Sequence, residues 1–380
     1  MNILNVNMSL DPITGGGTAE RTLQISRALA KMGHRCTILT IDTGLSPEYI
    51  RHCKKWSLGV VALPSLWKRF YLPKPSQHLI KRLVEKADVV QLMSHWTLIN
   101  VLVYRAVKQF EKPYLVCPAG ALPIFGRSRV LKKLYNYIIG GEIIRHANAC
   151  IAISPNEIDH FKSYCVPSGK VSVIPNGVNP GDFPESGGEI FRVRHGIGNA
   201  PLILFMGRLN IIKGPDMLLE AFYRCNQDGR LKEHHLVFTG PDGGMLQGLK
   251  RMVSECGLSG RVHFTGHISG DEKSDAYHSA DFLVIPSRQE AMSIVVLDAG
   301  ITGTPVLITD QCGFDDVATV AGGMVVEASV EGLRSGLLRM TGNPAKLKIM
   351  GQNLKKYTED HFLWDHMAKR HLELFSQVVH

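Results

Sequence analysis

Short apolar runs alternate with longer amphipathic stretches along the whole chain. In the first half, runs of five or six residues predict β-strands at 2–6, 36–41, 88–93, 113–117, 149–154 and 170–174. Amphipathic stretches at 22–32, 98–109 and 130–145 predict helices between them. This alternation is typical of α/β proteins, in which helices cover a parallel sheet.

A second series of apolar runs follows a break in the pattern. The stretch 175–200 contains PNGVNPGDFPESGG, where proline and glycine are too frequent for a strand or a helix. Beyond it, we expect a first domain over 1–180 to be joined through a linker over 181–200 to a second domain over 201–360. The elements predicted there are strands at 201–206, 235–239, 261–264, 281–286 and 305–309, and a last helix at 363–378.

Length and composition fit this two-domain interpretation. The 380 residues are about twice the usual domain length, and no apolar run reaches the roughly eighteen residues that a membrane span needs. The N-terminus shows no basic segment followed by a long apolar stretch, so we expect no signal peptide and a cytoplasmic location. The eight cysteines are scattered without a Cys-x-x-Cys pair, which favours reduced thiols over a metal site or disulfides.

Positive charge is concentrated in the first half of the chain. Residues 1–190 hold 23 Lys and Arg against 13 Asp and Glu, whereas residues 191–380 hold 20 against 21. The segments 66–75 and 126–140 interleave basic with aromatic and aliphatic residues, as segments at a membrane interface do. The charge is either an ordinary solvated surface or a face for anionic lipid or a phosphate-bearing acceptor. No nucleic-acid-binding motif accompanies it, so we expect no nucleic-acid partner.

Polar residues follow three predicted strands of the second half. Arg208 and Lys213 come after 201–206, a GPDGG turn comes after 235–239, and Glu290 comes after 281–286. Ligands of open α/β sheets bind beyond the carboxyl ends of the strands, so these loops are expected to meet at one edge. The two cations suit the negative charge of a diphosphate.

Glu290 and Asp298 stand on either side of a predicted helix start. Ser293 fits the N-cap position, which would turn the free N–H groups of Ile294 and Val295 toward the same edge. Eight helical residues rise about 12 Å and rotate by about 80°, so the two carboxylates are too far apart to act as an acid pair on one bond. They would instead contact opposite ends of one elongated ligand, and a nucleotide sugar has that form.

A cluster of three glycines, Gly15 to Gly17, separates a predicted strand from a helix in the first half. Glycines there allow backbone N–H groups to approach a phosphate or a sugar. The cluster is not G-x-G-x-x-G, because Glu20 stands where the last glycine would be, and the chain has no G-x-x-x-x-G-K-[ST] run. A dinucleotide dehydrogenase and a P-loop enzyme are therefore disfavoured.

Together these segments resemble the retaining glycosyltransferases of group 1, or family 4. Matching segments recur in family order from near residue 12 to near residue 315, and ADFLVIPSRQEAMSIVVLDAGITGTPVLITDQCG is the most specific of them. The resemblance implies the GT-B fold, an α/β architecture with two Rossmann-like parallel-sheet domains facing across a cleft. The acceptor would bind mainly to the first domain and the nucleotide mainly to the second, with the C-terminal helix, 361–380, returning to the first.

The resemblance also implies a mechanism and roles for individual residues. The sugar would be transferred with retention, the leaving phosphate would help to take the acceptor proton, and no metal or cofactor would be needed besides the UDP- or GDP-linked donor. By position, Arg208 and Lys213 match the cations on the diphosphate, and Ser293 and Ile294 match the amides around it. Glu290 matches the acid that holds the donor sugar, Asp298 matches the acid that holds the ribose, and Ile268 matches the contact with the nucleobase. Gly16 and Gly17 match the loop near the phosphates and the acceptor.

Two positions depart from the family pattern. Asp298 stands where the family usually has Glu, and it is shorter by one C–C bond of about 1.5 Å. The family often has a histidine after the strand that here reads YLVC, but this chain continues PAGAL. His95, after the neighbouring strand, is the candidate for contacting the donor sugar instead, although a histidine beside a tryptophan is more often a packed or capping residue.

The resulting expectation is a cytoplasmic enzyme, peripheral on the inner face of the membrane, that glycosylates a glycan or a lipid-linked acceptor. Synthesis of bacterial-type lipopolysaccharide or exopolysaccharide fits this acceptor class. The alternatives are an enzyme of the same fold that makes a small soluble glycoside or epimerises a nucleotide sugar, and a binding protein without catalytic activity. The presence of Arg208, Lys213 and Glu290 at the family's positions disfavours the last of these.

Overall fold

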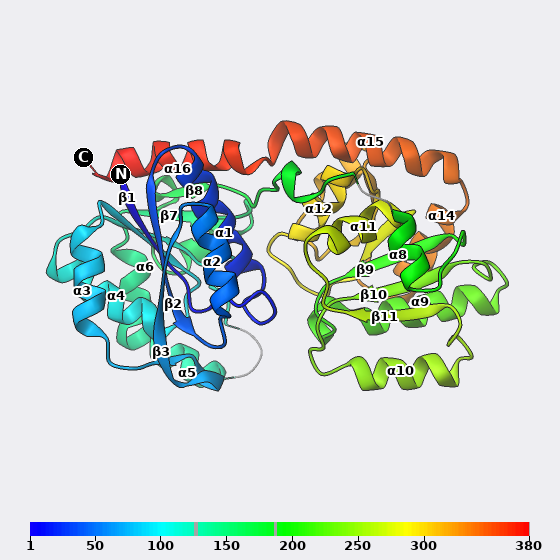
Figure 1. Ribbon diagram of the computed structural model, residues 1–380, viewed down its shortest axis with the longest axis horizontal. Helices are drawn as coiled ribbons and strands as arrows, with labels where there is room; N and C mark the ends of the chain where they lie inside the picture. Colours follow the sequence, from blue (N-terminus) through cyan, green and yellow to red (C-terminus); the bar gives the residue numbers. More distant parts are fainter. Residues whose placement is uncertain (125–127, 186–187, 380) are drawn as a thin grey trace. The chain divides into compact units, whose positions relative to one another are not determined.

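The computed structural model describes residues 1–124, 128–185 and 188–379, which divide into two compact units (Figure 1). Unit 1 comprises Met1–Asn176 and Trp364–His380, and unit 2 comprises Gly177–Leu363. The stretch 181–200, expected to be a linker, belongs to unit 2 and includes helix α8 (Gly188–Arg194). This short helix forms despite the neighbouring prolines and glycines because Phe191 is buried and α8 packs on the later helix α11 (Asp271–Ser279).

Unit 1 is built on an eight-stranded sheet with the order β4-β3-β2-β1-β5-β6-β7-β8. All neighbouring strands are parallel except β3 and β4, which form an antiparallel edge. The sequence pattern did not indicate these two strands, because β3 is mostly exposed or half-buried. The strands are β1 (Asn2–Val6), β2 (Arg35–Asp42), β3 (Gly59–Trp67), β4 (Leu72–Pro73), β5 (Val89–Met93), β6 (Tyr114–Cys117), β7 (Ala149–Ala152) and β8 (Val171–Val173).

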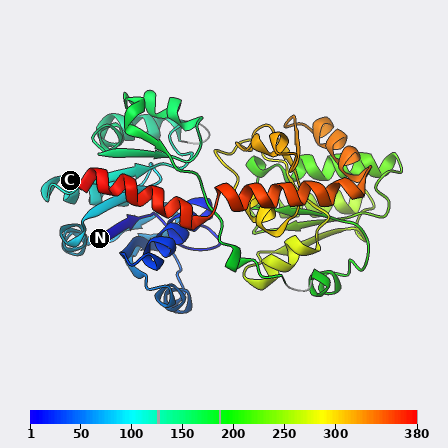
Figure 2. The same ribbon diagram turned by 90° about the horizontal axis from the view of Figure 1, so that it is seen from above.

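Helices cover both faces of the unit 1 sheet (Figures 1 and 2). Helix α16 packs on α1, so the C-terminal segment belongs to this unit. The helix predicted over 130–145 continues from α5 through a π-helical turn, η2 (Asn136–Gly140), into α6. The α-helices are α1 (Gly16–Lys31), α2 (Pro47–Lys55), α3 (Gln77–Lys86), α4 (Leu98–Gln109), α5 (Arg129–Tyr135), α6 (Gly141–Arg145), α7 (Glu157–Lys162) and α16 (Trp364–Val379).

Unit 2 is built on a six-stranded parallel sheet with the order β11-β10-β9-β12-β13-β14. Its central strand β9 reads LILFM and is buried almost throughout, as expected for a parallel strand covered on both faces. The strands are β9 (Leu202–Met206), β10 (His235–Thr239), β11 (Val262–Gly266), β12 (Phe282–Ile285), β13 (Val306–Thr309) and β14 (Gly323–Val326). Besides α8 and α11, the helices are α9 (Pro215–Gln227), α10 (Leu246–Glu255), α12 (Ile294–Thr302), α13 (Asp316–Thr319), α14 (Val330–Thr341) and α15 (Pro344–His361).

The architecture confirms the predicted α/β class. Each unit has a parallel sheet, covered by helices, around its own buried apolar cluster. Across the described ranges, no helix combines the length and the apolar character that crossing a membrane requires.

Candidate active site

Glycine turns shape the carboxyl edge of the unit 2 sheet. Gly207 follows β9 directly and Gly240 follows β10 directly. Gly240 has a φ of 139°, and a Cβ atom there would lie 2.0 Å from the Gly207 carbonyl oxygen. No larger residue fits at this position. Because β9 lies between β10 and β12, the loops after these three strands meet at one edge, as predicted.

Lys213 and Glu290 form an ion pair at this edge. Lys213 Nζ lies 2.8 Å from Glu290 Oε1, and the Glu290 side chain is only 10% exposed. Lys213 ends a short 3-10 turn that is capped by Asn210, whose side chain accepts from the Lys213 N–H at 3.0 Å. The Ser287 hydroxyl also donates to Glu290 Oε1. Both side-chain donors that the described residues supply therefore bind Oε1, which leaves Oε2 to accept from a ligand hydroxyl.

Arg208 lies half-buried in the same loop as Lys213. The loop is fixed to the one after β10, because the Leu209 N–H donates to the Pro241 carbonyl and the Gly243 N–H donates to the Leu209 carbonyl, both at 3.0 Å. The Arg208 stem runs along Gly243, where a Cβ atom would lie 2.9 Å from Arg208 Cγ. The two predicted cations thus stand on one loop whose backbone is held by hydrogen bonds to the loop after β10.

Helix α12 begins at Ile294, directly after Ser293, as the sequence predicts. Ser293 occupies the N-cap position, but its hydroxyl does not cap the helix. The side chain is fully buried, and within the described residues its Oγ has no hydrogen-bond partner. The Ser293 N–H donates to the Cys312 carbonyl at 3.2 Å. A buried hydroxyl without a partner, at the positive end of a helix, fits a site whose missing partner is an anionic ligand.

Asp298 lies further along α12 and pairs with a cation of its own. Lys273 Nζ is 2.8 Å from Asp298 Oδ2, and the Tyr277 hydroxyl donates to the same oxygen at 3.3 Å. The Asp298 side chain is 6% exposed, and the two donors come from α11, which packs on α12. Burial and the Asp298 charge raise the pKa of Tyr277 well above its usual value, so its hydroxyl stays a donor. As with Glu290, the described partners occupy one oxygen and leave the other, Oδ1, to a ligand.

Ile268 lies at the far end of this row of loops. It follows the edge strand β11, next to β10, and its side chain is buried. Along the sheet, the loop after β11 is therefore followed by the loops that carry the Arg208–Lys213 pair and Glu290. The predicted donor-site residues of unit 2 all stand at the carboxyl edge of one sheet or on the helix that begins there.

The predicted glycine loop belongs to unit 1. Gly16 has a φ of 63° and begins α1, and Gly17 lies in the first turn of that helix. The turn before it is closed by Asp11, whose carbonyl accepts from the Gly15 N–H and whose side chain accepts from the Ile13 N–H, both at 2.8 Å. Apart from its chain neighbours and the backbone of its own helix, no atom of the described residues lies within 4 Å of a Cβ built at Gly16, which leaves room there for a ligand.

His95 lies inside unit 1. Its side chain is 1% exposed, its Nε2 is 2.8 Å from Asn136 Oδ1, and its ring contacts Trp96, Tyr135 and Tyr164. Burial lowers the pKa of His95 to about 4, so the ring is neutral at physiological pH. In the structure His95 is therefore a packed residue, the alternative interpretation of its position after a strand. A contact with a donor sugar would require the ring to leave this cluster.

Sequence reasoning missed the partners of the two carboxylates. Ser287 stands three positions before Glu290 and directly after a predicted strand, so its position was a usable signal. Lys273 and Tyr277 lie more than twenty positions from Asp298 and carry no motif, so only the packing of α11 on α12 reveals them. Among the described residues, no three His, Cys, Asp or Glu side chains are grouped as a metal site would require.

Models of two families match most of the chain. Residues 15–182 match the model described as Glycosyltransferase Family 4, and residues 189–357 match Glycosyl transferases group 1. Their boundary falls close to the beginning of unit 2. Every strand except β1, and the site at the edge of the second sheet, therefore lie in segments that match these models.

Individual relatives agree with the family models. An uncharacterized glycosyltransferase of Methanocaldococcus jannaschii is 26% identical over 393 residues, which cover 99% of this chain and 98% of that protein. A D-inositol 3-phosphate glycosyltransferase of Streptomyces bingchenggensis is 31% identical over 255 residues, but the match spans only 64% of this chain and 56% of that protein. The crystal structure of HepE of Anabaena in complex with UDP has a TM-score of 0.80 at 16% identity, covering 99% of this chain and all of HepE.

Proposed function

Because the chain belongs to the group 1 glycosyltransferases of family 4 and has their GT-B fold, we propose that it transfers a sugar from a UDP- or GDP-linked donor to a glycan or lipid-linked acceptor, with retention of configuration. One observation carries the proposal. Glu290 and Asp298 flank the N-terminus of α12, and each is held by one lysine through one oxygen, while no described residue donates to its other oxygen. Two such carboxylates fit the hydroxyl-bearing ends of a nucleotide sugar.

Each part of the donor has a matching group at this edge. The diphosphate would lie against the N-terminus of α12, between the Ser293 hydroxyl and the cations Arg208 and Lys213. Glu290 Oε2 would accept from the hydroxyls of the sugar, and Asp298 Oδ1 would accept from the hydroxyls of the ribose. Asp298 is shorter than the usual Glu, and Lys273 and Tyr277 keep its carboxylate in a fixed position.

The groups at this edge suit a reaction in which charge grows on the leaving diphosphate. The bond between the sugar C1 and the phosphate oxygen breaks, the acceptor oxygen forms a bond to C1 on the same face, and the acceptor proton passes to the leaving phosphate. Arg208, Lys213 and the α12 N–H groups stabilise the leaving group through preorganised positive charge. We propose that these groups supply the charge compensation without a metal ion.

Binding of the donor can be tested by thermal unfolding with UDP, GDP and ADP. A matched nucleotide at a hundred times its Kd stabilises the folded chain by about 2.7 kcal/mol, which raises Tm by about 5–10 °C. We expect one of the uridine or guanosine diphosphates to give this shift, and to give it equally in EDTA. Equal small shifts with all three would contradict a nucleotide site, and a shift that EDTA removes would contradict the metal-free proposal.

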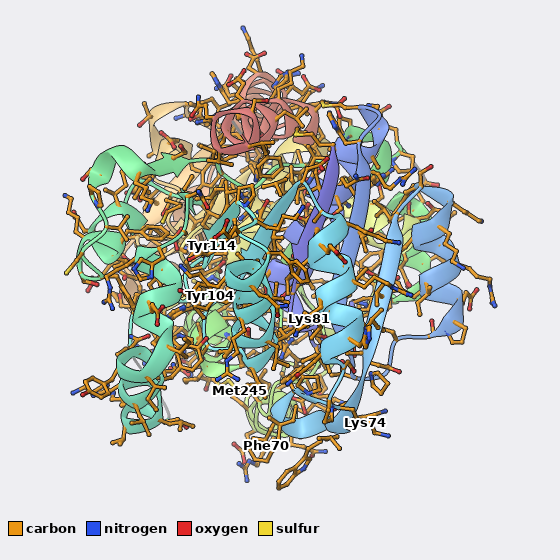
Figure 3. The ribbon with its side chains drawn as sticks, turned by 90° about the vertical axis from the view of Figure 1, so that its left-hand side faces the viewer. Phe70, Lys74, Lys81, Tyr104, Tyr114 and Met245 are labelled. Atoms are coloured by element: carbon orange, nitrogen blue, oxygen red, sulfur yellow. The ribbon has the colours of Figure 1, made fainter. Side chains whose placement is uncertain are left out.

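We also propose that unit 1 contacts an anionic membrane, where lipid-linked acceptors of the lipopolysaccharide or exopolysaccharide type reside. The segment 66–75 presents Leu66, Trp67 and Phe70, each more than half exposed, beside the exposed Lys68 and Lys74. Figure 3 shows Phe70 and Lys74 at the lower end of unit 1, where Figure 1 also places α5. The second predicted segment, 126–140, lies outside the described residues at 126 and 127, and its remainder forms α5 and η2. This placement would locate the enzyme on the cytoplasmic face.

Membrane contact predicts binding to vesicles that depends on salt. The protein should sediment with vesicles containing phosphatidylglycerol at 0.1 M salt and be mostly released at 1 M, because the Debye length falls from about 10 Å to about 3 Å. Vesicles of phosphatidylcholine alone serve as the control and should bind little. Equal binding to both kinds of vesicle, or binding to neither, would contradict the proposed contact.

A small acceptor is the second candidate, and the D-inositol 3-phosphate glycosyltransferase among the relatives favours it. Such an enzyme would bind its donor in the same way but would not sediment with anionic vesicles. An epimerase would convert the donor without an acceptor, and a pure binding protein would give the thermal shift without turnover. Incubating the donor with and without an extract that contains candidate acceptors separates the transferase, the epimerase and the binding protein. The transferase consumes the donor only with the extract, the epimerase converts it without the extract, and the binding protein leaves it unchanged.

A further inference from the structure

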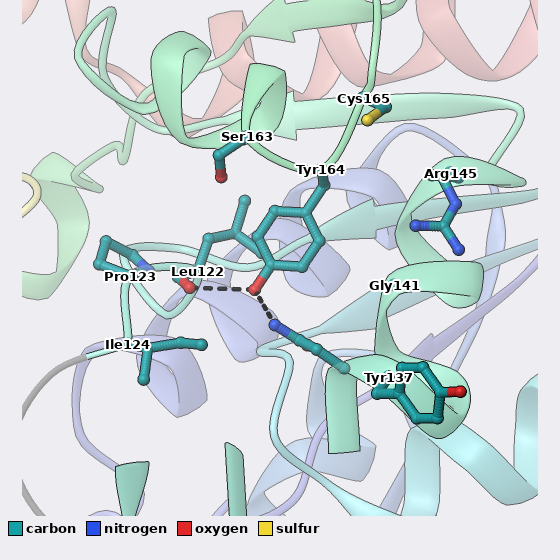
Figure 4. Close-up of a pocket in the computed structure, with 10 residues that line it drawn as sticks. Leu122, Pro123, Ile124, Tyr137, Gly141, Arg145, Ser163, Tyr164 and Cys165 are labelled. Carbon is teal, nitrogen blue, oxygen red and sulfur yellow. Dashed lines mark hydrogen bonds between the residues drawn. The ribbon is translucent and has the colours of Figure 1, made fainter. Parts of the chain in front are cut away.

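Unit 1 contains a pocket that none of the proposed donor contacts uses. It has a volume of about 520 Å³ and lies between the loop after β6, the helix formed by η2 and α6, and the C-terminal end of α7 (Figure 4). Arg145 and Tyr137 stand on one side of it, and Pro123 and Ile124 stand on the other. The pocket thus has a cationic and aromatic side opposite an apolar side.

The cationic side holds charge without a protein counterion. Among the described residues, no carboxylate pairs with the Arg145 guanidinium. Lys170 brings a second positive charge close by, because its Nζ donates to the Arg145 carbonyl at 3.1 Å. The acid on the same helix, Glu142, is engaged elsewhere, since its Oε1 accepts from the Tyr104 hydroxyl at 2.8 Å and faces His146 Nδ1 at 3.7 Å. Arg145 is the cation that lines the pocket, Lys170 adds positive charge beside that residue, and no acid is among the lining residues, so the cationic side fits an anion.

The wall of the pocket is preorganised by a partly buried chain of hydrogen bonds. His95 Nε2 is 2.8 Å from Asn136 Oδ1, and Asn136 Nδ2 donates to the Tyr164 hydroxyl at 2.7 Å. The Tyr164 hydroxyl in turn donates to the Leu122 carbonyl at 3.1 Å, as Figure 4 shows. This chain fixes the loop after β6 against η2 and α7, so the two sides of the pocket hold their separation without a ligand.

The same helix continues out of the pocket as an exposed apolar stripe. Its members occur at the spacing of one helical face and are between 50% and 90% exposed: Val130, Leu131, Leu134, Tyr137 and Ile138. Basic residues accompany the stripe in α5 at Arg129, Lys132 and Lys133. Tyr137 belongs both to the stripe and to the pocket, so the two surfaces are continuous. Apolar residues exposed to this degree beside basic ones fit the interface of an anionic membrane.

We propose that the pocket binds the phosphate group of an anionic membrane lipid. Arg145 would pair with the phosphate, Lys170 would add positive charge nearby, Tyr137 would cover the phosphate, and the acyl chains would lie along the exposed stripe of α5 and η2. The proposal rests on the membrane contact proposed above and makes it specific, because it gives one lipid a defined site in addition to general attraction by charge.

The test uses dihexanoyl phosphatidylglycerol below its critical micelle concentration, so that no membrane surface is present. Calorimetric titration should show saturable binding, and Arg145→Gln should weaken that binding at least tenfold. The matched control is Arg82→Gln, which removes the same charge from an exposed position on α3 and should leave the affinity unchanged. Equal weakening by both substitutions would overturn the pocket, because it would reduce the effect to net charge.

Two further probes separate the lipid from a free anion. Inorganic phosphate should bind at least tenfold more weakly than the lipid, since it gains nothing from the apolar side. Dihexanoyl phosphatidylcholine, with the same chains and phosphate but a compensating positive charge, should also bind more weakly. Inorganic phosphate that binds as tightly as the lipid would overturn the lipid assignment.

The donor site provides an independent check on each variant. Arg145→Gln should keep the full thermal shift with the matched nucleotide, which shows that the chain is folded and unit 2 is intact. Lipid binding that depends on Arg145, in a chain that no nucleotide stabilises, would refute the proposed transfer and leave the lipid pocket standing. A normal thermal shift with the nucleotide but no lipid binding would refute the lipid pocket and leave the proposed transfer standing.

Discussion

Replacing Glu290 by alanine is expected to reduce sugar transfer about 1000-fold while leaving the fold intact. The substitution removes the acceptor that would hold the sugar hydroxyls, and it also leaves Lys213 without its partner at 2.8 Å. A lysine that is no longer held beside the sugar would be less well placed on the leaving diphosphate. Because one residue supports both groups, the loss should appear in kcat as well as in KM. The measurement is steady-state kinetics with the donor that the thermal screen identifies.

Two variants make this result specific to the carboxylate. Glu290→Gln keeps the shape and one acceptor oxygen, so it should be less damaging than alanine but still well below the wild type. Glu255→Ala removes an exposed acid from the end of α10 and should leave turnover unchanged. Wild-type turnover in Glu290→Ala would exclude the assigned site. A Tm lowered by more than a few degrees would mean that the loss is structural.

The replacement Lys273→Met is expected to weaken binding of the nucleoside diphosphate about tenfold, with kcat at saturating donor changed little. Asp298 is almost fully buried, and Lys273 supplies its only cation among the described residues. Without the ammonium, the Tyr277 hydroxyl is the one described donor that the carboxylate keeps. The carboxylate is then less firmly held in position, and its buried negative charge has no counterion among the described residues. Direct titration of the nucleoside diphosphate measures the loss, since the effect belongs to the ribose end of the ligand and not to the reacting bond.

The lysine acts through Asp298, so controls must separate positioning from general charge. Lys273→Arg should restore most of the affinity, whereas Lys250→Met, on the exposed face of α10, should not lower it. In combination with Asp298→Asn, the effect of Lys273→Met should largely disappear, because the two residues act as one unit. Additive losses in the double variant would show that Lys273 contacts the nucleotide independently of Asp298.

Most of the fold could be predicted because the apolar pattern itself carries the information. Strands such as β9 are apolar on both faces, and each predicted strand of the second half is present in the sheet. The antiparallel edge of β3 and β4 was missed because an edge strand need not be apolar on both faces. Helix α8 was missed because a single buried aromatic residue, Phe191, stabilises a turn inside a stretch rich in proline and glycine.

The sequence predicted which loops carry the candidate site, but not which side chains pair with its two carboxylates. Glu290, Arg208 and Lys213 follow strands, and the parallel sheet places the ends of its strands together regardless of detail. The pairing of Asp298 with Lys273 depends on how two helices pack, which no local pattern records. His95 shows a second limit, because a position after a strand indicates an edge but does not tell whether the side chain faces a ligand or the interior, where the structure places it.

The π-helical turn η2 sets the rotational phase of the helix that contains it. A π turn carries one residue more than a regular α-helical turn, so everything after Gly140 is rotated by about 100° relative to an uninterrupted helix. The apolar stripe of α5 and η2 therefore faces outward, while Ile143 and Ile144, which follow the turn, face the core. One added residue thus lets a single helix expose its apolar residues along α5 and η2 and bury them along α6. Deleting one residue from the turn would rotate the two parts relative to each other, so that they could not both keep their present faces.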